Sequence, residues 1–207
     1  MPASITWIAL LMAVLCVPHR SEASASPLAM IRTTVERSMT ILTDPAYQGK
    51  DNFHQRITKL EQILLPQIDS WEFGRRCLGV HWQQLTDDQR RQFIDLFKDL
   101  IEKSYGGMLD RYTTGVRFSY DGERIDGDFA EVDTRVFTPA REQPFTLSYR
   151  LHQKDGQWLI YDVVAENVSM VRNYRTQFDH ILSKSSFAEL AQTLERKIKQ
   201  LETAPTL

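Results

Sequence analysis

The residue types that most often perform chemistry are scattered along this chain of 207 residues, without the spacing that such chemistry needs. Its histidines and two cysteines form neither the H-E-x-x-H nor the C-x-x-C pattern of a zinc site. Asp121, Asp126 and Asp128 lie beside glycines as in a calcium loop, but no glutamate follows at EF-hand spacing. We therefore interpret this segment as a solvated hairpin turn and expect no bound metal.

Nucleophilic and nucleotide chemistry also lack their local sequence patterns. The chain has no G-x-S-x-G elbow, no G-x-x-x-x-G-K-[ST] loop and no G-x-G-x-x-G fingerprint. Asp133 or Asp162 could in principle serve as a general base, in a polar cavity that raises the pKa of the carboxyl group. An enzyme is therefore the third of three hypotheses, and we expect neither covalent catalysis nor a cofactor.

The N-terminal segment is set apart from the rest by an uncharged apolar run from Ile8 to Val17. The run has the length of a signal-peptide core and is too short to span a bilayer. Small residues at 23–25 form an A-x-A cleavage pattern, so the sequence predicts a signal peptide over 1–25, with a short anchor as the alternative. Leu15 precedes Cys16 where a lipobox needs a small residue, so we expect no lipidation.

Composition favours one domain stabilised by an apolar core. Hydrophobic residues make up 42% of the chain, and Cys77 is the single cysteine beyond the predicted signal, so no internal disulfide is expected. The formal net charge of −2 provides no strong overall field for nucleic acid or an anionic membrane. Arg196, Lys197 and Lys199 lie between Glu195 and Glu202, and we interpret them as the solvated face of a terminal helix.

Apolar residues recur at steps of three and four before residue 114, which predicts a helical part over 26–114. Thr86 and Gln89 form a capping box at the start of the strongest predicted helix. Gly106 and Gly107 interrupt that helix, so we expect a kink or a break there.

After Gly115 the period changes to two, and residues typical of strands follow over 115–166. Four alternating runs with hairpin signals between them predict an antiparallel meander, and helical spacing returns over 168–202. Because strands are grouped and do not alternate with helices, the predicted class is α+β.

Residues 162–178, D-V-V-A-E-N-V-S-M-V-R-N-Y-R-T-Q-F, resemble the signature of the MlaC, or toluene-tolerance, family, in which D-V runs into G-V-S-L and then N-Y-R-x-Q-F. A second block of this chain resembles the family in the order of its residues, which are Leu65, Pro66, Asp69, Leu78, Gly79, Trp82, Thr86, Gln89, Phe93, Phe97 and Tyr105. Departures fall at Cys77, Ala165 and Asn167, the last of which tolerates the left-handed backbone of the usual glycine. The resemblance implies an NTF2-like twisted antiparallel sheet of about four strands enclosed by amphipathic helices, as one domain over 26–207.

For function, the resemblance implies a periplasmic phospholipid-binding shuttle that maintains outer-membrane lipid asymmetry. Its implied partners are an outer-membrane lipoprotein–porin complex and an inner-membrane ABC transporter complex with an MCE-domain subunit. We expect phospholipid as cargo, no nucleic acid and a monomer. The second hypothesis is a ligand-free periplasmic adaptor for an ABC transporter, and the third is an NTF2-like enzyme.

A carrier must shelter two acyl chains of about 15 methylenes each, whose exposure to water costs on the order of 20–25 kcal/mol. That cost requires an enclosed apolar cavity, whose wall alternate strand residues can form. The predicted wall residues are Val132, Val136, Leu147, Tyr149 and Leu151, and the predicted mouth residues are Tyr105, Leu109, Tyr112 and Val168. The same alternation is equally typical of an ordinary filled core.

Tyr174 and Arg175 are candidate contacts for the phospholipid headgroup, because a guanidinium group binds phosphate through two hydrogen bonds. The alternative for Arg175 is a structural ion pair with Asp162 or Glu166.

Overall fold

The structure is a computed structural model that describes residues 25–49, 51–111 and 115–203. Most of the predicted signal peptide, with Cys16, lies outside these residues, as does Tyr112. The helices are α1 (Pro27–Thr43), α2 (Phe53–Leu64), α3 (Ser70–Leu78), α4 (Asp87–Arg111), α5 (Met170–Leu182) and α6 (Phe187–Thr203), with short 3₁₀ helices η1 (Pro45–Tyr47), η2 (Leu65–Gln67) and η3 (Gly79–Gln84). The strands are β1 (Arg117–Asp126), β2 (Phe129–Phe137), β3 (Phe145–Lys154), β4 (Gln157–Ala165) and β5 (Val168–Ser169).

The strands form one antiparallel sheet in the order β1-β2-β3-β4-β5, which confirms the predicted α+β class and meander. The sequence predicted four strands and missed β5, because two residues are too few to show alternation. Glu166 and Asn167 both have positive φ, 48° and 65°, in the turn from β4 to β5. Asn167 therefore adopts the left-handed backbone that its side chain tolerates.

Helix α4 continues through Gly106 and Gly107, so the structure has no break there. A Cβ built on Gly106 would lie 3.6 Å from Ile57 and 3.9 Å from Phe53 of α2. Both distances are ordinary van der Waals contacts, so Gly106 packs beside α2 within a continuous helix.

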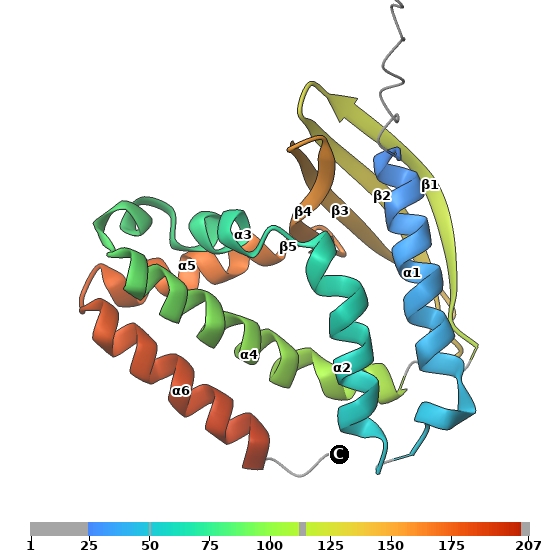
Figure 1. The fold of residues 1–207 in the computed structure, drawn as a ribbon, viewed down its shortest axis with the longest axis horizontal. Helices are drawn as coiled ribbons and strands as arrows, with labels where there is room; N and C mark the ends of the chain where they lie inside the picture. The colour runs from blue at the N-terminus through green and yellow to red at the C-terminus, as the bar shows by residue number, and fades with distance from the viewer. Residues whose placement is uncertain (1–24, 50, 112–114, 204–207) are drawn as a thin grey trace, which may run out of the picture.

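The core has two parts. In the first, Ile31 of α1 packs with Ala130, Val132, Leu151 and other apolar residues of the sheet. In the second, aromatic residues of α4 and α5 pack among α3, η3 and α6. Figure 1 shows α1 lying along the sheet, while α4 and α6 lie side by side away from it.

Asp69 joins the helical part to the sheet. Its backbone N–H donates to the carbonyl of Ile160 in β4, and its carboxylate caps α3 by accepting from the Glu72 N–H at 2.9 Å. The same carboxylate accepts from Lys154 Nζ at 2.9 Å. Burial of Asp69 opposes its ionisation, but these two hydrogen bonds and the Lys154 charge outweigh burial and lower the pKa.

Because its folded pKa lies below the ordinary value of 3.8, Asp69 stabilises the fold above that pH, and this contribution is lost as pH falls through the folded pKa. We predict that Asp69→Asn lowers the free energy of unfolding by about 1 kcal/mol at neutral pH. The deficit should shrink as pH is lowered from about 5 to 2 in urea titrations followed by circular dichroism. Asp126→Asn, at an exposed position, is the control, and a deficit unchanged at low pH would contradict this role.

Asp162 fixes the junction of β4, β5 and α5. It is 2% exposed and accepts hydrogen bonds from Ser169 Oγ at 2.6 Å, the Val171 N–H at 3.0 Å and Arg150 Nη1 at 3.3 Å. Its removal would leave buried donors unsatisfied.

We predict that Asp162→Ala lowers the free energy of unfolding by about 3–5 kcal/mol, because it leaves these buried donors without an acceptor. Asp121→Ala removes an exposed carboxylate paired with Arg135 and should lower the free energy of unfolding much less. Chemical denaturation of both variants measures the difference. Equal losses would show that Asp162 is no more important than a surface ion pair.

Candidate functional site

The sheet register places all five predicted wall residues on one face, which we call the inner face. Val132 lies opposite Tyr149, Thr134 opposite Leu147 and Ala130 opposite Leu151, and Val136 continues the same alternation on β2. The inner face is also the one on which α1 packs, since Ile31 contacts the cluster that contains Val132 and Leu151. The predicted alternation is therefore correct, and the remaining question is whether the face is filled.

The inner face is covered unevenly. Val132 and Leu151 are 0% exposed and Val136 is 3% exposed, so these three are fully packed. Leu147 and Tyr149 are only partly buried, although β3 is the central strand. Helix α1 lies against β1 and β2, and Ile31 packs with both Val132 of β2 and Leu151 of β3. Leu147 and Tyr149, earlier along β3, keep accessible surface.

Helix α1 turns small side chains inward over much of its length. Its buried stripe is Pro27, Ile31, Thr34, Ser38 and Leu42. Thr34 and Ser38 each donate to a backbone carbonyl one turn earlier, at 2.8 Å, so neither hydroxyl needs a partner from the sheet. Two small side chains with satisfied hydroxyl groups fill less space than leucine or phenylalanine would at the same positions.

Tyr149 combines deep placement with accessible surface. Burial raises the pKa of its phenol well above the ordinary range, with the nearby Tyr120 adding to the effect and a hydrogen bond with Thr134 opposing it. The phenol of Tyr149 thus lies in low-dielectric surroundings, while part of the residue keeps accessible surface.

Exposure increases toward the β5 side of the inner face. Ala165 pairs with both Leu147 and Val168, so the three form one row across β3, β4 and β5. Ala165 is exposed and Val168 is 61% exposed. Tyr105 of α4 is 39% exposed and its hydroxyl lies beside that of Tyr174.

Of the predicted mouth residues, Val168 thus lies at the open end of an inner-face row. The side chain of Leu109 and all of Tyr112 lie outside the described part of the chain.

The two candidate headgroup contacts are placed differently, since Tyr174 is buried and Arg175 is exposed. Tyr174 is 8% exposed in the helical core, with its ring centroid 4.8 Å from that of Phe97 and 5.5 Å from that of Phe178. Arg175 donates from Nε to the carbonyl of Arg76 at 2.7 Å, in the last turn of α3. The alternative of an ion pair with a carboxylate is wrong, because the partner is this carbonyl.

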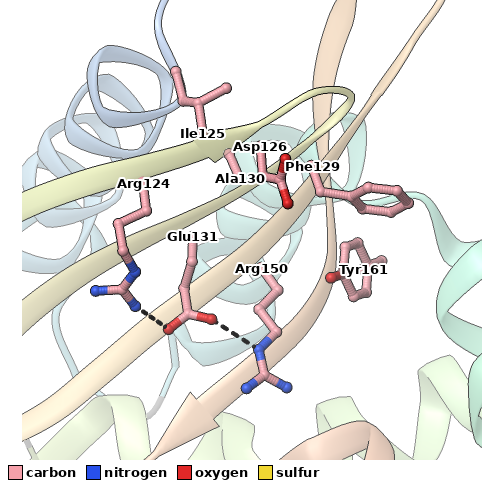
Figure 2. A pocket seen from close by; sticks show the side chains of 8 residues that line it. All are labelled: Arg124, Ile125, Asp126, Phe129, Ala130, Glu131, Arg150 and Tyr161. Atoms are coloured by element: carbon pink, nitrogen blue, oxygen red, sulfur yellow. Dashed lines mark hydrogen bonds and ion pairs between the residues drawn. The ribbon is translucent and has the colours of Figure 1, made fainter.

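Two hollows of the described structure lie elsewhere. The larger, about 600 Å³, lies on the sheet face opposite the inner one and is lined by Arg124, Ile125, Asp126, Phe129, Ala130, Glu131, Arg150 and Tyr161 (Figure 2). Glu131 accepts from Arg124 at 2.7 Å and from Arg150 at 3.1 Å across its floor. The smaller, about 250 Å³, lies between η3 and α6 beside His81 and Phe187. None of the predicted wall residues lines either hollow.

The two aspartates considered as general bases are both engaged in structural networks. Asp133 accepts from Ser148 at 2.6 Å and from Arg124 at 2.9 Å, and Asp162 holds the β4–α5 junction. Neither carboxylate lies on the inner face, since both alternate with its residues. Within residues 25–49, 51–111 and 115–203, no three His, Cys, Asp or Glu side chains are placed to hold a metal ion.

Among the residues that the structure describes, no helix is both long and apolar enough to cross a membrane.

Inner-face residues that the sequence analysis did not name as wall candidates include Phe145, Val163 and Ala165. Phe145 continues the alternation of β3 and was detectable as such. Val163 and Ala165 pair with Tyr149 and Leu147 only because a bulge between Arg150 and Leu151 shifts the register of β4. No local sequence pattern marks that bulge, so single-sequence periodicity could not assign these two residues.

Comparisons with known proteins give consistent results. A family model described as "MlaC protein" matches residues 32–196. The chain is 23% identical over 200 residues to the intermembrane phospholipid transport system binding protein MlaC of Haemophilus influenzae, covering 94% of each chain. It is 22% identical over 177 residues to toluene tolerance protein ttg2D of Pseudomonas putida, covering 85% of this chain and 82% of that protein.

A solved structure with the same fold is the phospholipid-binding protein from Ralstonia solanacearum in complex with a phospholipid. It matches with a TM-score of 0.79 and 25% identity, over 86% of this chain and 100% of that one. The family model spans most of the chain, and the match includes every strand and the helices from α2 to α5. This chain belongs to the MlaC family.

Proposed function

We propose that this protein is a phospholipid carrier that holds acyl chains against the inner face of its sheet. The observation that carries the proposal is the incomplete burial of Leu147 and Tyr149, on the central strand of an otherwise packed apolar face. The phospholipid bound to the Ralstonia solanacearum relative supports the same class of ligand.

The unequal cover of the inner face suits this role. The sealed residues under α1 stabilise the domain, because their packing contributes about 25 cal/mol for each Å² of apolar surface buried. The partly accessible residues retain apolar surface that a hydrocarbon chain can cover. Exchange with a bilayer is then close to balanced in free energy, because both environments are apolar.

We further propose that the chain works in the periplasm after cleavage near residue 25, as a single lipid-binding domain over 26–207. Ser26 caps α1 through a hydrogen bond from the Ala29 N–H, and a helix start at this point supports a boundary near residue 25. The proposed exchange partners are an outer-membrane lipoprotein–porin complex and an inner-membrane MCE-domain ABC transporter. The name of the Haemophilus influenzae relative, an intermembrane phospholipid transport protein, supports this route.

The direct test is organic extraction of the purified protein, without its first 25 residues, followed by lipid mass spectrometry. The proposal predicts phospholipid in a defined ratio to protein. Protein that remains free of lipid after incubation with phospholipid vesicles would overturn the carrier role and favour a ligand-free adaptor.

A substitution that fills the accessible space should remove the cargo. We predict that Leu147→Trp lowers bound phospholipid at least about fivefold, with the fold retained, because the indole occupies space next to a partly buried site. Thr146→Trp, at the next position of β3 on the opposite face, is the matched control and should retain lipid.

Val132→Trp is a less informative variant, because Val132 is 0% exposed and a larger side chain there would strain the packed core. Extraction and mass spectrometry, with circular dichroism as the folding check, measure the outcome. Full lipid content in Leu147→Trp would show that the acyl chains bind elsewhere.

A further inference from the structure

Arginine and exposed apolar residues gather where α3, η3 and the start of α5 meet. Helix α5 packs against both α3 and η3, and Figure 1 shows α3 and α5 close together beside β5. The side chain of Arg175 lies over Gly79, within 3.5 Å of a Cβ built there, and donates to the Arg76 carbonyl. This contact joins the exposed sides of the two helices into one surface.

We call this surface the α3–α5 patch and define it by six residues: Trp71, Arg75, Arg76, Val80, Arg172 and Arg175. Trp71 is 40% exposed and stands edge-on to Trp82 at 5.0 Å, and Val80 is 75% exposed. Arg172 and Arg175 are both exposed and lie three residues apart on α5, hence on one side of that helix.

The charge of the patch is opposite in sign to that of the whole chain. Within the patch, Glu72 accepts hydrogen bonds from Arg75 at 2.6 Å and from Arg76 at 2.7 Å. The Arg76 guanidinium also lies over the Tyr161 ring, 3.9 Å from its centroid. Asp179, further along α5, contacts His81 at 2.8 Å. A local excess of positive charge therefore exists on a chain whose formal net charge is −2.

We propose that the α3–α5 patch docks reversibly on an anionic lipid surface. Tryptophan with arginine and an exposed aliphatic side chain is the combination that membrane interfaces favour, because the indole and valine enter the headgroup region while arginines attract lipid phosphates. Each arginine near such a surface strengthens binding about fivefold, so the patch gives weak, reversible attachment. An acidic protein would use the charges but gain little from the exposed Trp71 and Val80.

The patch adjoins the open end of the inner face. Val168, 61% exposed, ends the row that contains Leu147, and α5 begins two residues later. Docking would therefore bring this edge of the sheet to the lipid surface. This orienting role rests on the proposed carrier function, whereas the docking itself does not.

The test is sedimentation of the protein with vesicles of phosphatidylglycerol mixed into phosphatidylcholine, and with vesicles of phosphatidylcholine alone. The wild-type protein should bind the anionic vesicles in low salt and less at about 0.15 M salt, where the Debye length is about 8 Å. Arg172→Glu should weaken binding about 25-fold and Arg172→Gln about fivefold. Val80→Glu should also weaken it.

The matched control is Lys197→Glu, which makes the same charge change at an exposed position of α6 and should alter binding less than about twofold. Lipid extraction of each variant separates docking from carriage, because Arg172→Glu should keep its bound phospholipid. Three results would overturn the proposal: no binding of the wild type to anionic vesicles in low salt, equal binding to neutral vesicles, or equal losses in Arg172→Glu and Lys197→Glu. Binding of an acidic protein without vesicle binding would overturn it as well.

Discussion

The structure depends on an apolar sheet face that is wider than the helix covering it. Helix α1 lies along β1 and β2 and seals Val132 beneath Ile31, whereas Leu147 and Tyr149 on the next strand keep accessible surface. A face sealed across its full width would be an ordinary core. A face without any cover would lead to aggregation in water. The partial cover lets the domain stay folded while apolar surface remains for a ligand.

This arrangement requires the sheet and the helical part to be held together by contacts outside the acyl-chain site. Asp69 and Asp162 do so at neighbouring points of β4: the first bonds to Ile160 and joins α3 to β3 and β4, and the second joins β4 to α5. Both are buried carboxylates with hydrogen-bond donors already arranged around them. Because polar networks connect the layers, the inner face does not have to be filled by large side chains for the fold to persist.

Much of this could be predicted from the sequence. Alternation assigned the inner-face residues of β2 and β3, capping residues located α4, and the D-V to N-Y-R-x-Q-F segment indicated the family. Three features could not be predicted, for physical reasons. The bulge that brings Val163 beside Tyr149 leaves no periodic trace, β5 is too short to alternate, and the partners of Tyr174 and Arg175 depend on helices distant in sequence. Periodicity identifies a buried face, but only the placement of α1 shows which part of it is left accessible.

The central claim is that the space beside Leu147 and Tyr149 accepts a hydrocarbon chain. A crystal structure of the protein saturated with a phospholipid carrying brominated acyl chains tests it most directly, because anomalous scattering locates the bromine atoms without model bias. Our account predicts bromine peaks within van der Waals contact of Leu147 or Tyr149 on the inner face. Bromine peaks confined to the hollow lined by Phe129 and Tyr161 on the opposite face would contradict this claim. An inner face closed by protein side chains in the saturated crystal would contradict it as well.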